Sequence, residues 1–387
     1  MNPLRRKILP SLAVVFLLPA IVFGAPAAPD SRVSLETTLS AAPSKGLKLG
    51  FELYGNGWES SVTQSRIAGA EITGEISRPL GEAFTANLGL GLVLEAGMAR
   101  SRFTDEFRPR QGVRLREASI SWKPWEPVTV VAGALDQDRW DAPLLLRRQS
   151  YPSAYERFAL PFGKFTVAFA AMQSVVTDTS TLQPWGNWSQ SLPSFFLERI
   201  SVEWKHSART LISVHGSHFA FKDLSHQHAY DAQFLGNSVV GVGPENTNFR
   251  YGFQGFEMGA EASVELMTGL SPFIRGDVIW NTTAANGRGL GWSAKAGVLW
   301  AQGDRLRFRP SFELFRVESD ASPALFSSRV FGHSNRQGWA ASLGVELPKS
   351  GLRGQVQWVS SDVIAATPLQ AGATWLGFQL SMDYDAI

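Results

Sequence analysis

Hydrophobic and polar residues alternate along most of the chain, from about residue 46 to residue 384. Residues 84–97 show the alternation best. Leucine, alanine and phenylalanine fill one set of positions there, while glycine, threonine, asparagine, valine and glutamate fill the other. A period of two residues is that of a β-strand, whose successive side chains point to opposite faces of the sheet. The pattern therefore predicts an all-β protein.

The same alternation recurs at residues 47–53, 292–300 and 376–384. Strands of about ten residues suit a tilted crossing of a lipid bilayer. An apolar outer face would then contact lipid, and a small or polar inner face would contact water. We therefore predict a transmembrane antiparallel up-and-down β-barrel. A soluble all-β protein is the alternative.

Connections between the predicted strands differ in length on the two sides of the barrel. Short turns, which we assign to the periplasmic side, lie at residues 78–81, 123–127, 160–163, 206–208, 268–270, 303–304 and 348–351. External loops lie at residues 55–66, 98–112, 136–153, 175–194, 222–251, near 286–287, 318–336 and 362–372. These connections join about 16 strands with both termini on the periplasmic side. The weakest strand covers residues 154–160, so 14 and 18 strands remain alternatives.

Tryptophan placement favours the membrane barrel, because aromatic rings gather at both interfaces of a bilayer. Three tryptophans fall near predicted periplasmic strand ends and three near predicted external ends. They are, respectively, Trp122, Trp204 and Trp300, and Trp280, Trp292 and Trp339.

The N-terminus has the layout of a secretory signal peptide. Arg5, Arg6 and Lys7 precede an apolar run at residues 8–23, and small residues and prolines follow it. The run is too short for a spanning helix, which needs about 20 apolar residues, so a retained anchor is the weaker alternative. We expect residues 1–24 to form a signal peptide, residues 25–45 an N-terminal extension and residues 46–387 the barrel.

Charge and cysteine content exclude several classes of protein. Without the three signal-peptide cations the net charge falls from +2 to −1 (+2 − 3 = −1), and no basic run could neutralise nucleic-acid phosphates. The absence of cysteine excludes disulfides, thiol chemistry and a lipid-modified N-terminal cysteine. No cofactor is implied. An exported barrel belongs in the bacterial outer membrane, with the bilayer, lipopolysaccharide, small solutes and ions as its partners.

Residues 115–134 carry a more specific pattern. An acidic residue and alanine, Glu117 and Ala118, precede a short turn at Lys123 and Pro124, and the following strand ends near Gly133. This hairpin resembles that of the phosphate-selective group of bacterial porins. The resemblance implies a 16-stranded porin, usually a homotrimer, whose third external loop folds into the lumen and narrows it. The sequence lacks a lysine cluster of the kind such channels use for oxyanions, so the resemblance does not extend to phosphate selectivity.

The third external loop, residues 136–153, follows that hairpin and occupies the position of the constriction. It carries charges of both signs, which suits an eyelet that selects solutes by size and charge. A solvated surface loop is the alternative. The candidate constriction residues are Asp136, Asp138, Arg139, Asp141, Arg147 and Arg148.

Charged residues also recur on the predicted inner faces. Charges are costly in a dry core, so their number favours a water-filled lumen, with a plugged barrel of paired charges as the alternative. Acids gather on early and central strands and arginines toward the C-terminal third, which predicts a transverse field across the pore. The candidate lumen residues are Glu95, Glu117, Glu257, Glu261, Arg275, Asp277, Lys295, Arg307, Arg309, Glu313 and Arg353, with Glu71, Glu75, Glu265 and Glu346 on the same faces.

Groupings of residues that could support catalysis or bind a metal are weak. His333 and Ser334 are neighbours, so His333 could activate Ser334 only in a loop. His226, His228 and Asp231 could ligate a metal if their segment were a strand, although a solvated loop is the simpler interpretation. We therefore expect no enzyme but a general diffusion porin for small hydrophilic solutes. A structural or adhesive barrel and, less favoured, a barrel hydrolase are the alternatives.

Overall fold

The structure, a computed structural model, describes residues 46–101, 108–147, 149–176, 192–207, 210–327, 331 and 333–385. The predicted signal peptide and N-terminal extension lie outside these residues. Within the described residues, no helix is long and apolar enough to cross a membrane.

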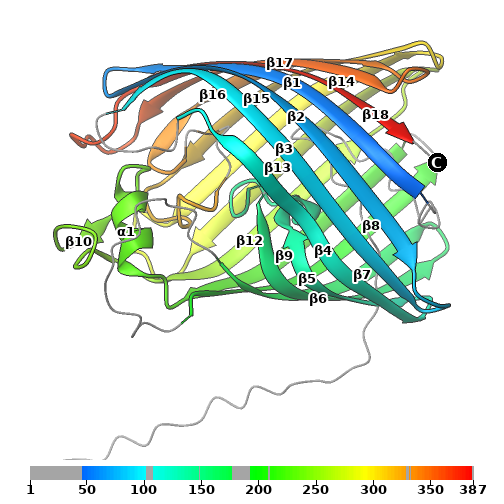
Figure 1. Ribbon diagram of the computed structural model, residues 1–387, viewed down its shortest axis with the longest axis horizontal. Coiled ribbons are helices and arrows are strands. Elements are labelled where there is room, and N and C mark those ends of the chain that lie inside the picture. Colours follow the sequence, from blue (N-terminus) through cyan, green and yellow to red (C-terminus); the bar gives the residue numbers. More distant parts are fainter. Residues whose placement is uncertain are drawn as a thin grey trace, which may run out of the picture.

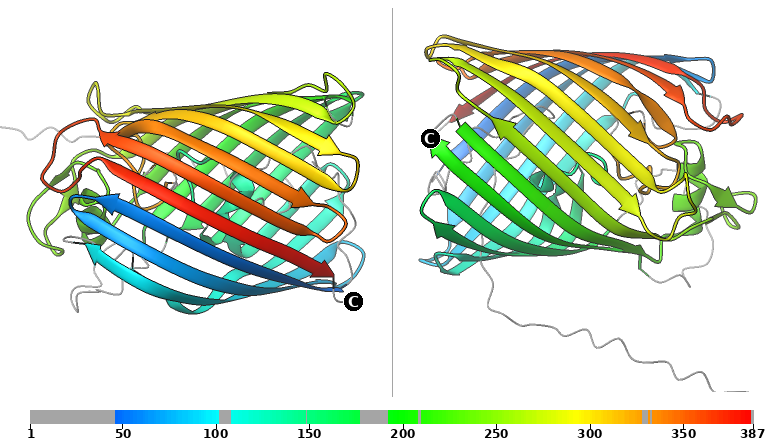
Figure 2. Two further views of the ribbon diagram at one scale, coloured as in Figure 1. Left: turned by 90° about the horizontal axis from the view of Figure 1, so that it is seen from above. Right: turned by 180° about the vertical axis from the view of Figure 1, so that it is seen from behind.

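Sixteen antiparallel strands close into a single barrel, in which each strand pairs with its neighbours in the chain and β1 pairs with β18 (Figures 1 and 2). The barrel strands are β1 (Gly46–Ser60), β2 (Thr63–Pro79), β3 (Phe84–Ser101), β4 (Gln111–Trp125), β5 (Val128–Asp136), β6 (Ser150–Phe162), β7 (Phe165–Val175), β8 (Ser194–Ser207), β9 (Thr210–Lys222), β12 (Phe253–Ser263), β13 (Leu270–Asn281), β14 (Leu290–Gln302), β15 (Leu306–Val317), β16 (Arg336–Leu347), β17 (Leu352–Val363) and β18 (Ala373–Asp385). Closure leaves no unpaired sheet edge, as a membrane requires. The predicted count of 16 is confirmed, and the doubtful segment at 154–160 lies within β6.

The outer face of the barrel is apolar and exposed. On β3, Leu88, Leu90, Leu92 and Leu94 are each between 42% and 51% exposed, whereas Gly89, Gly91 and Val93 on the inner face are buried. Such a continuous apolar wall is unfavourable in water and is stabilised by lipid. The apolar positions of the alternation therefore form the outer face of the barrel wall, and the positions between them form its inner face.

Aromatic pairs lie near both ends of the strands. Phe84 stacks on Trp122 and Phe165 on Trp204, with ring centroids 6.0 and 6.2 Å apart, beside short turns at the periplasmic ends. Toward the external ends, Trp339 contacts Trp358 at 5.3 Å. This arrangement is that of the two aromatic girdles of a membrane barrel.

The first external connection is much shorter than the sequence predicted. Residues 55–66 were expected to form a loop, but β1 and β2 continue through them and only Ser61 and Val62 connect the strands. The Ser60 hydroxyl closes the turn by donating to the Thr63 carbonyl at 3.0 Å and accepting from the Thr63 amide at 2.9 Å. The prediction was wrong because polar residues that face the inside of a barrel have the composition of a loop.

The fifth external loop is the longest connection and contains α1 (His226–Gln233) and a small hairpin of β10 (Val239–Val240) and β11 (Asn248–Phe249). These elements lie at the end of the barrel opposite the C-terminus (Figure 1). A metal site at His226, His228 and Asp231 was the less favoured interpretation of this segment and needed a strand, but the segment is a helix. Gln227 donates to both carboxylate oxygens of Asp231, at 3.0 Å each. The favoured interpretation, a solvated loop, does not hold for His228, which is only 2% exposed.

Candidate functional site: the lumen and its third loop

The third external loop turns into the barrel instead of covering it (Figures 1 and 2). It begins with a 3-10 helix, Gln137–Trp140, and the Trp140 side chain is only 3% exposed. The indole of Trp140 donates to the sulfur of Met172 on β7 at 2.9 Å. The next residue, Asp141, has a φ of 47°, in the left-handed region, and reverses the chain direction.

Asp136 belongs to the barrel and not to this loop, because it is the last residue of β5 and pairs with Ser150. Asp138 and Arg139 contribute their backbone to the 3-10 helix. Their side chains, and Arg148 as a whole, lie outside the described residues. Arg147 donates from Nε to the amide oxygen of Gln149 at 3.2 Å.

Two arginines of the barrel wall hold the loop in place. Arg275 on β13 forms an ion pair with Asp141, with 2.5 Å between Nη1 and Oδ2, and donates from Nη2 to the Asp141 carbonyl at 3.0 Å. Arg199 on β8 donates from Nη1 to the Trp140 carbonyl. The loop is therefore attached through both its side chains and its backbone.

Each of these arginines also neutralises a buried carboxylate of the barrel wall. Asp277 lies on β13 together with Arg275, and Glu257 lies on β12, two strands away from Arg199 on β8. Arg275 Nε lies 2.8 Å from Asp277 Oδ2, and Arg199 Nη2 lies 3.0 Å from Glu257 Oε2. The carboxylates are nearly inaccessible, with exposed side-chain fractions of 2% for Asp277 and 1% for Glu257. Unpaired charges there would be strongly destabilising, so the network stabilises the wall as well as the loop.

Asp141 itself remains in contact with the lumen, since its side chain is 64% exposed although the barrel surrounds it. The surrounding protein inside the barrel raises the pKa of Asp141 by limiting its solvation, but the charge and hydrogen bonds of Arg275 outweigh this effect and hold the pKa below its ordinary value. The ion pair with Arg275 therefore persists at neutral pH.

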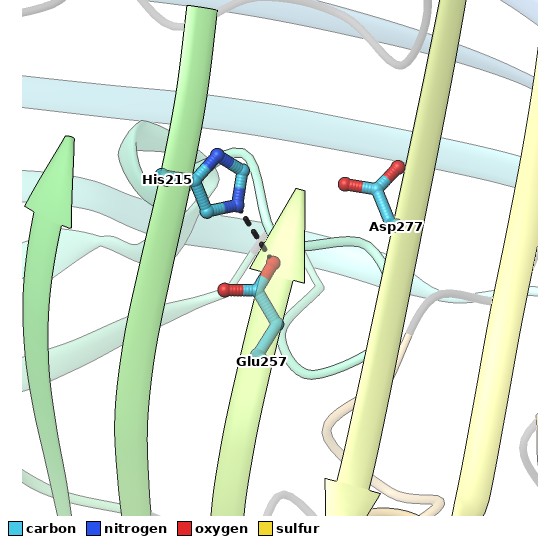
Figure 3. Close-up of side chains that lie close together, drawn as sticks. All are labelled: His215, Glu257 and Asp277. Atoms are coloured by element: carbon cyan, nitrogen blue, oxygen red, sulfur yellow. Dashed lines mark hydrogen bonds and ion pairs between the residues drawn. The ribbon is translucent and has the colours of Figure 1, made fainter. Parts of the chain in front are cut away.

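His215, Glu257 and Asp277 come together on three adjacent strands, β9, β12 and β13 (Figure 3). His215 Nε2 lies 2.8 Å from Glu257 Oε1. Gly259, the cross-strand partner of both His215 and Asp277, leaves the space that these side chains fill. A Cβ at this glycine would lie 2.3 Å from His215 Cε1 and 2.8 Å from Asp277 Oδ1.

The atoms that these three residues could offer as metal ligands lie within 4.8 Å of one another. However, Asp277 already accepts from Arg275 at both oxygens, at 2.8 and 3.0 Å. Glu257 accepts from Arg199 and from the Ser217 hydroxyl, at 3.0 and 2.8 Å. A metal ion would have to displace two guanidinium groups. The geometry therefore supports an internal ion-pair network and not a cation site.

Beyond this network, the external half of the lumen is partly filled by apolar side chains. Leu144, Leu145 and Leu146 of the third loop are at most 5% exposed, and they belong to one buried cluster with Phe326 and Phe331 of the seventh loop. Inward-facing wall residues complete this cluster, among them Phe195, Phe219, Phe221, Phe253, Ile279 and Phe315. The Ser322 hydroxyl donates to the Leu144 carbonyl at 2.8 Å and joins the two loops. The inner face is thus not polar throughout.

The wall formed by β1 to β4 differs from this filled side. Tyr54 donates to Glu95 Oε1 at 2.6 Å, and Arg116 Nη2 lies 2.9 Å from Glu71 Oε1. Charged groups, of which Glu75 and Arg114 are exposed, therefore lie on the inner face of β2 and β4.

The eleven predicted lumen residues have the strand phase of the inner face, and seven of them form an ion pair with another described residue, whereas their role as the lining of a pore stays a prediction. Lys295 pairs with Glu313 at 3.8 Å, Arg307 with Glu346 at 3.5 Å, and Arg353 with Asp383. Arg309 lies over the ring of Phe273, with 4.8 Å to its centroid. Ser119 donates to Glu117 at 2.6 Å. Glu261 belongs to β12 and Glu265 to the turn after it. Such local pairing weakens the transverse field that the sequence suggested.

The sequence did not single out Arg116 and Arg199, which make the internal contacts. The alternation along β8 could have identified Arg199, because Arg199 lies two and four positions after Leu197 and Phe195, which face inward. The direction of Arg116 could not be predicted from alternation. The pairing of β3 with β4 has a register shift between Gly89 and Leu90, and this β-bulge interrupts the alternation on β4. His215 faces inward and His218 outward, because residues three positions apart on a strand point to opposite faces.

No protein-family model matches the chain, and no curated protein matches its sequence. Among solved structures, the high-pH structure of Pseudomonas putida OprB aligns with a TM-score of 0.54 and 12% identity, over 88% of this chain and 94% of that chain. Salmonella typhi OmpF in complex with daunomycin aligns with a TM-score of 0.51 and 10% identity, over 88% of this chain and 98% of that chain. This likeness shows the fold: the chain is a transmembrane β-barrel with the architecture of outer-membrane porins. The resemblance to the phosphate-selective group stays a prediction.

Proposed function

We propose that the protein is a porin of the bacterial outer membrane, through which small hydrophilic solutes and ions pass by diffusion without chemical change. One observation carries this proposal. The side chain of Asp141 is 64% exposed although it lies inside a closed barrel, so water has access to the lumen beside the third loop. A pore needs such a hydrated space next to its narrowest element.

The third loop would form the constriction. It places Asp141 against the charged wall at Arg275 and turns its leucines toward the apolar cluster. Solutes would then pass between the hydrated side of this loop and the wall of β1 to β4, where Glu75 and Arg114 are exposed. Charges of both signs line this path, so we expect weak ion selectivity.

Two further features belong to this proposal. Lipopolysaccharide would surround the external part of the barrel, and the chain would assemble as a homotrimer, as the sequence resemblance implies. A hydrolytic role is disfavoured because His333 and Ser334 are 2% and 0% exposed, and His333 Nδ1 lies 2.9 Å from the Ala324 carbonyl. A substrate would have no access to this pair.

Conductance of the purified protein in a planar lipid bilayer tests the proposal. We expect stepwise ion currents, and a small reversal potential across a salt gradient. Asp141→Asn should change the size of the steps, because it loosens the loop beside the pathway. The matched control is Asp304→Asn, in the short turn between β14 and β15. Absence of conductance in correctly folded protein would overturn the porin proposal and favour a structural or adhesive barrel.

A further inference from the structure

Polar side chains interrupt the apolar outer face of the barrel on four consecutive strands. We define the polar strip as Glu156 on β6, Gln173 on β7, Glu198 on β8 and His218 on β9. Their outward direction follows from the strand alternation, because Tyr155, Met172, Leu197 and Phe219 beside them are buried inside the barrel. Glu156, Ala171, Glu198 and His218 follow one another across the strands as cross-strand partners.

Glu156 is the most anomalous residue of the strip. It is the central residue of β6, six positions from Ser150 and six from Phe162, so it lies in the middle of the membrane-spanning wall. Its side chain is exposed, and its cross-strand partners are Val130 and Ala171, neither of which can hydrogen-bond to a carboxylate through its side chain. A carboxylate that faces hydrocarbon is unfavourable, and ionisable groups in membrane segments usually mark functional contacts.

The surroundings of the strip also differ from the rest of the outer wall. Its outward-facing neighbours include Ala132, Ala154 and Ala171, all small and exposed. On β18, by contrast, the outward positions are Leu376, Phe378, Leu380 and Met382, from 39% to 56% exposed. Small side chains let two membrane-embedded surfaces approach closely, and polar groups can then hydrogen-bond across the contact.

We propose that the polar strip is the surface on which a second copy of this chain packs. The strip is self-complementary, because it has carboxylate acceptors in Glu156 and Glu198 and donors in Gln173 and His218. Within one copy, His218 Nδ1 already lies 3.4 Å from Glu198 Oε2. A rotation about the membrane normal that places the strip nearest the symmetry axis brings equivalent residues of neighbouring copies close to each other. Lipopolysaccharide is disfavoured as the occupant because two carboxylates would repel its phosphates.

Cross-linking tests the proposal directly, since the sequence contains no cysteine and every single-cysteine variant therefore has one thiol. The test variants are Ala132→Cys, Ala154→Cys and Ala171→Cys, and the matched control is Phe378→Cys on the wall of β18. Each protein is oxidised, or treated with a short bismaleimide, in intact outer membranes. We expect covalent homodimers from at least one strip variant and none from Phe378→Cys. No homodimer from the strip, equal cross-linking of the control, or a product with a different protein would overturn the proposal.

Glu156→Leu gives a second test, because an interface and a lipid-facing wall predict different effects of this substitution on the oligomer and on the unfolding temperature. If the strip is an interface, native mass spectrometry in mild detergent should show loss of the oligomer while the barrel still folds. If Glu156 faces lipid, the leucine should raise the unfolding temperature and leave the oligomer unchanged, and the proposal fails. This inference rests on the homotrimer that belongs to the proposed function. Neither test uses conductance, so failure of the strip as an interface can be distinguished from failure of the diffusion pathway.

Discussion

Arg199 and Arg275 each connect the third loop to a buried carboxylate of the barrel wall, which lies two strands away for Arg199 and on the same strand for Arg275. Arg199 joins Trp140 to Glu257, and Arg275 joins Asp141 to Asp277. Because the carboxylates are buried, each guanidinium group stabilises the wall by preventing an unpaired internal charge. The position of the loop is therefore coupled to the stability of the barrel.

Arg199→Met should lower the free energy of unfolding by about 3 kcal/mol, because it leaves Glu257 buried without its guanidinium partner. Urea unfolding in lipid vesicles, followed by tryptophan fluorescence, measures this change. The control is Arg307→Met, since Arg307 and Glu346 are about a third exposed and their pair contributes at most about 1 kcal/mol. Equal losses in the two variants would contradict the argument.

Asp141 predicts a specific pH dependence. Its pKa is lowered in the folded protein, so its ion pair with Arg275 contributes stability above the ordinary pKa of about 3.9 and loses it only as the pH falls through the lower folded value. The ratio of the conductance of Asp141→Asn to that of the natural protein should therefore stay constant from about pH 7 to pH 5. It should approach one only in stronger acid. A ratio that already changes near pH 6 would show that Asp141 is not held by Arg275.

At the scale of elements, the third loop has two unlike sides. Its leucines pack into the apolar cluster with the seventh loop, while the side chain of Asp141 is 64% exposed. A loop held only by charge pairs would respond to salt, but apolar packing adds stabilisation that salt does not screen. The loop should therefore behave as a fixed constriction and not as a mobile gate.

Replacement of residues 141–147 by glycine and serine of equal length should raise the single-channel conductance severalfold. It removes both the leucines and the ion pair that keep the loop in position. The matched control replaces residues 284–287, in the external loop between β13 and β14, in the same way and should leave conductance unchanged. An unchanged conductance in the 141–147 variant would remove the third loop from the constriction.

At the scale of the whole molecule, the barrel depends on closure between its first and last strands. β1 and β18 pair over thirteen residue pairs, from Lys48 with Asp385 to Ser60 with Ala373. Without that pairing, two strand edges would carry unpaired backbone groups in hydrocarbon, each at a cost of several kcal/mol. Closure is therefore cooperative, and no strand of the wall is dispensable.

Deletion of residues 373–387 should abolish the folded barrel. Folded membrane barrels resist detergent, so the measurement is the difference in gel mobility between heated and unheated samples. We expect no difference for the truncated chain. Deletion of residues 241–247, which connect β10 to β11 outside the wall, should keep the difference. A folded barrel after loss of β18 would show that another strand pairing can close the sheet.

The sequence alone determined the wall of this protein. A two-residue alternation suits a wall with lipid on one side and a lumen on the other, so the inward positions of Glu257, Arg275 and Asp277 could be derived from phase. The count of about 16 strands also needed the positions of the turns and loops, and it left 14 and 18 strands as alternatives. The same argument failed at residues 55–66, because inward-facing polar residues and loop residues have similar compositions.

Only the tertiary structure decided what the interior contains. The direction in which the third loop turns, the contacts of Arg199 with Trp140 and Glu257, and the apolar cluster around Leu145 all join residues from distant strands. Phase along a strand says which face a residue occupies, but not which residues meet across a closed barrel. A single β-bulge beside Gly89 prevented the alternation from predicting the direction of Arg116. The wall is thus encoded locally, whereas the shape and charge of the lumen depend on contacts that exist only after the barrel closes.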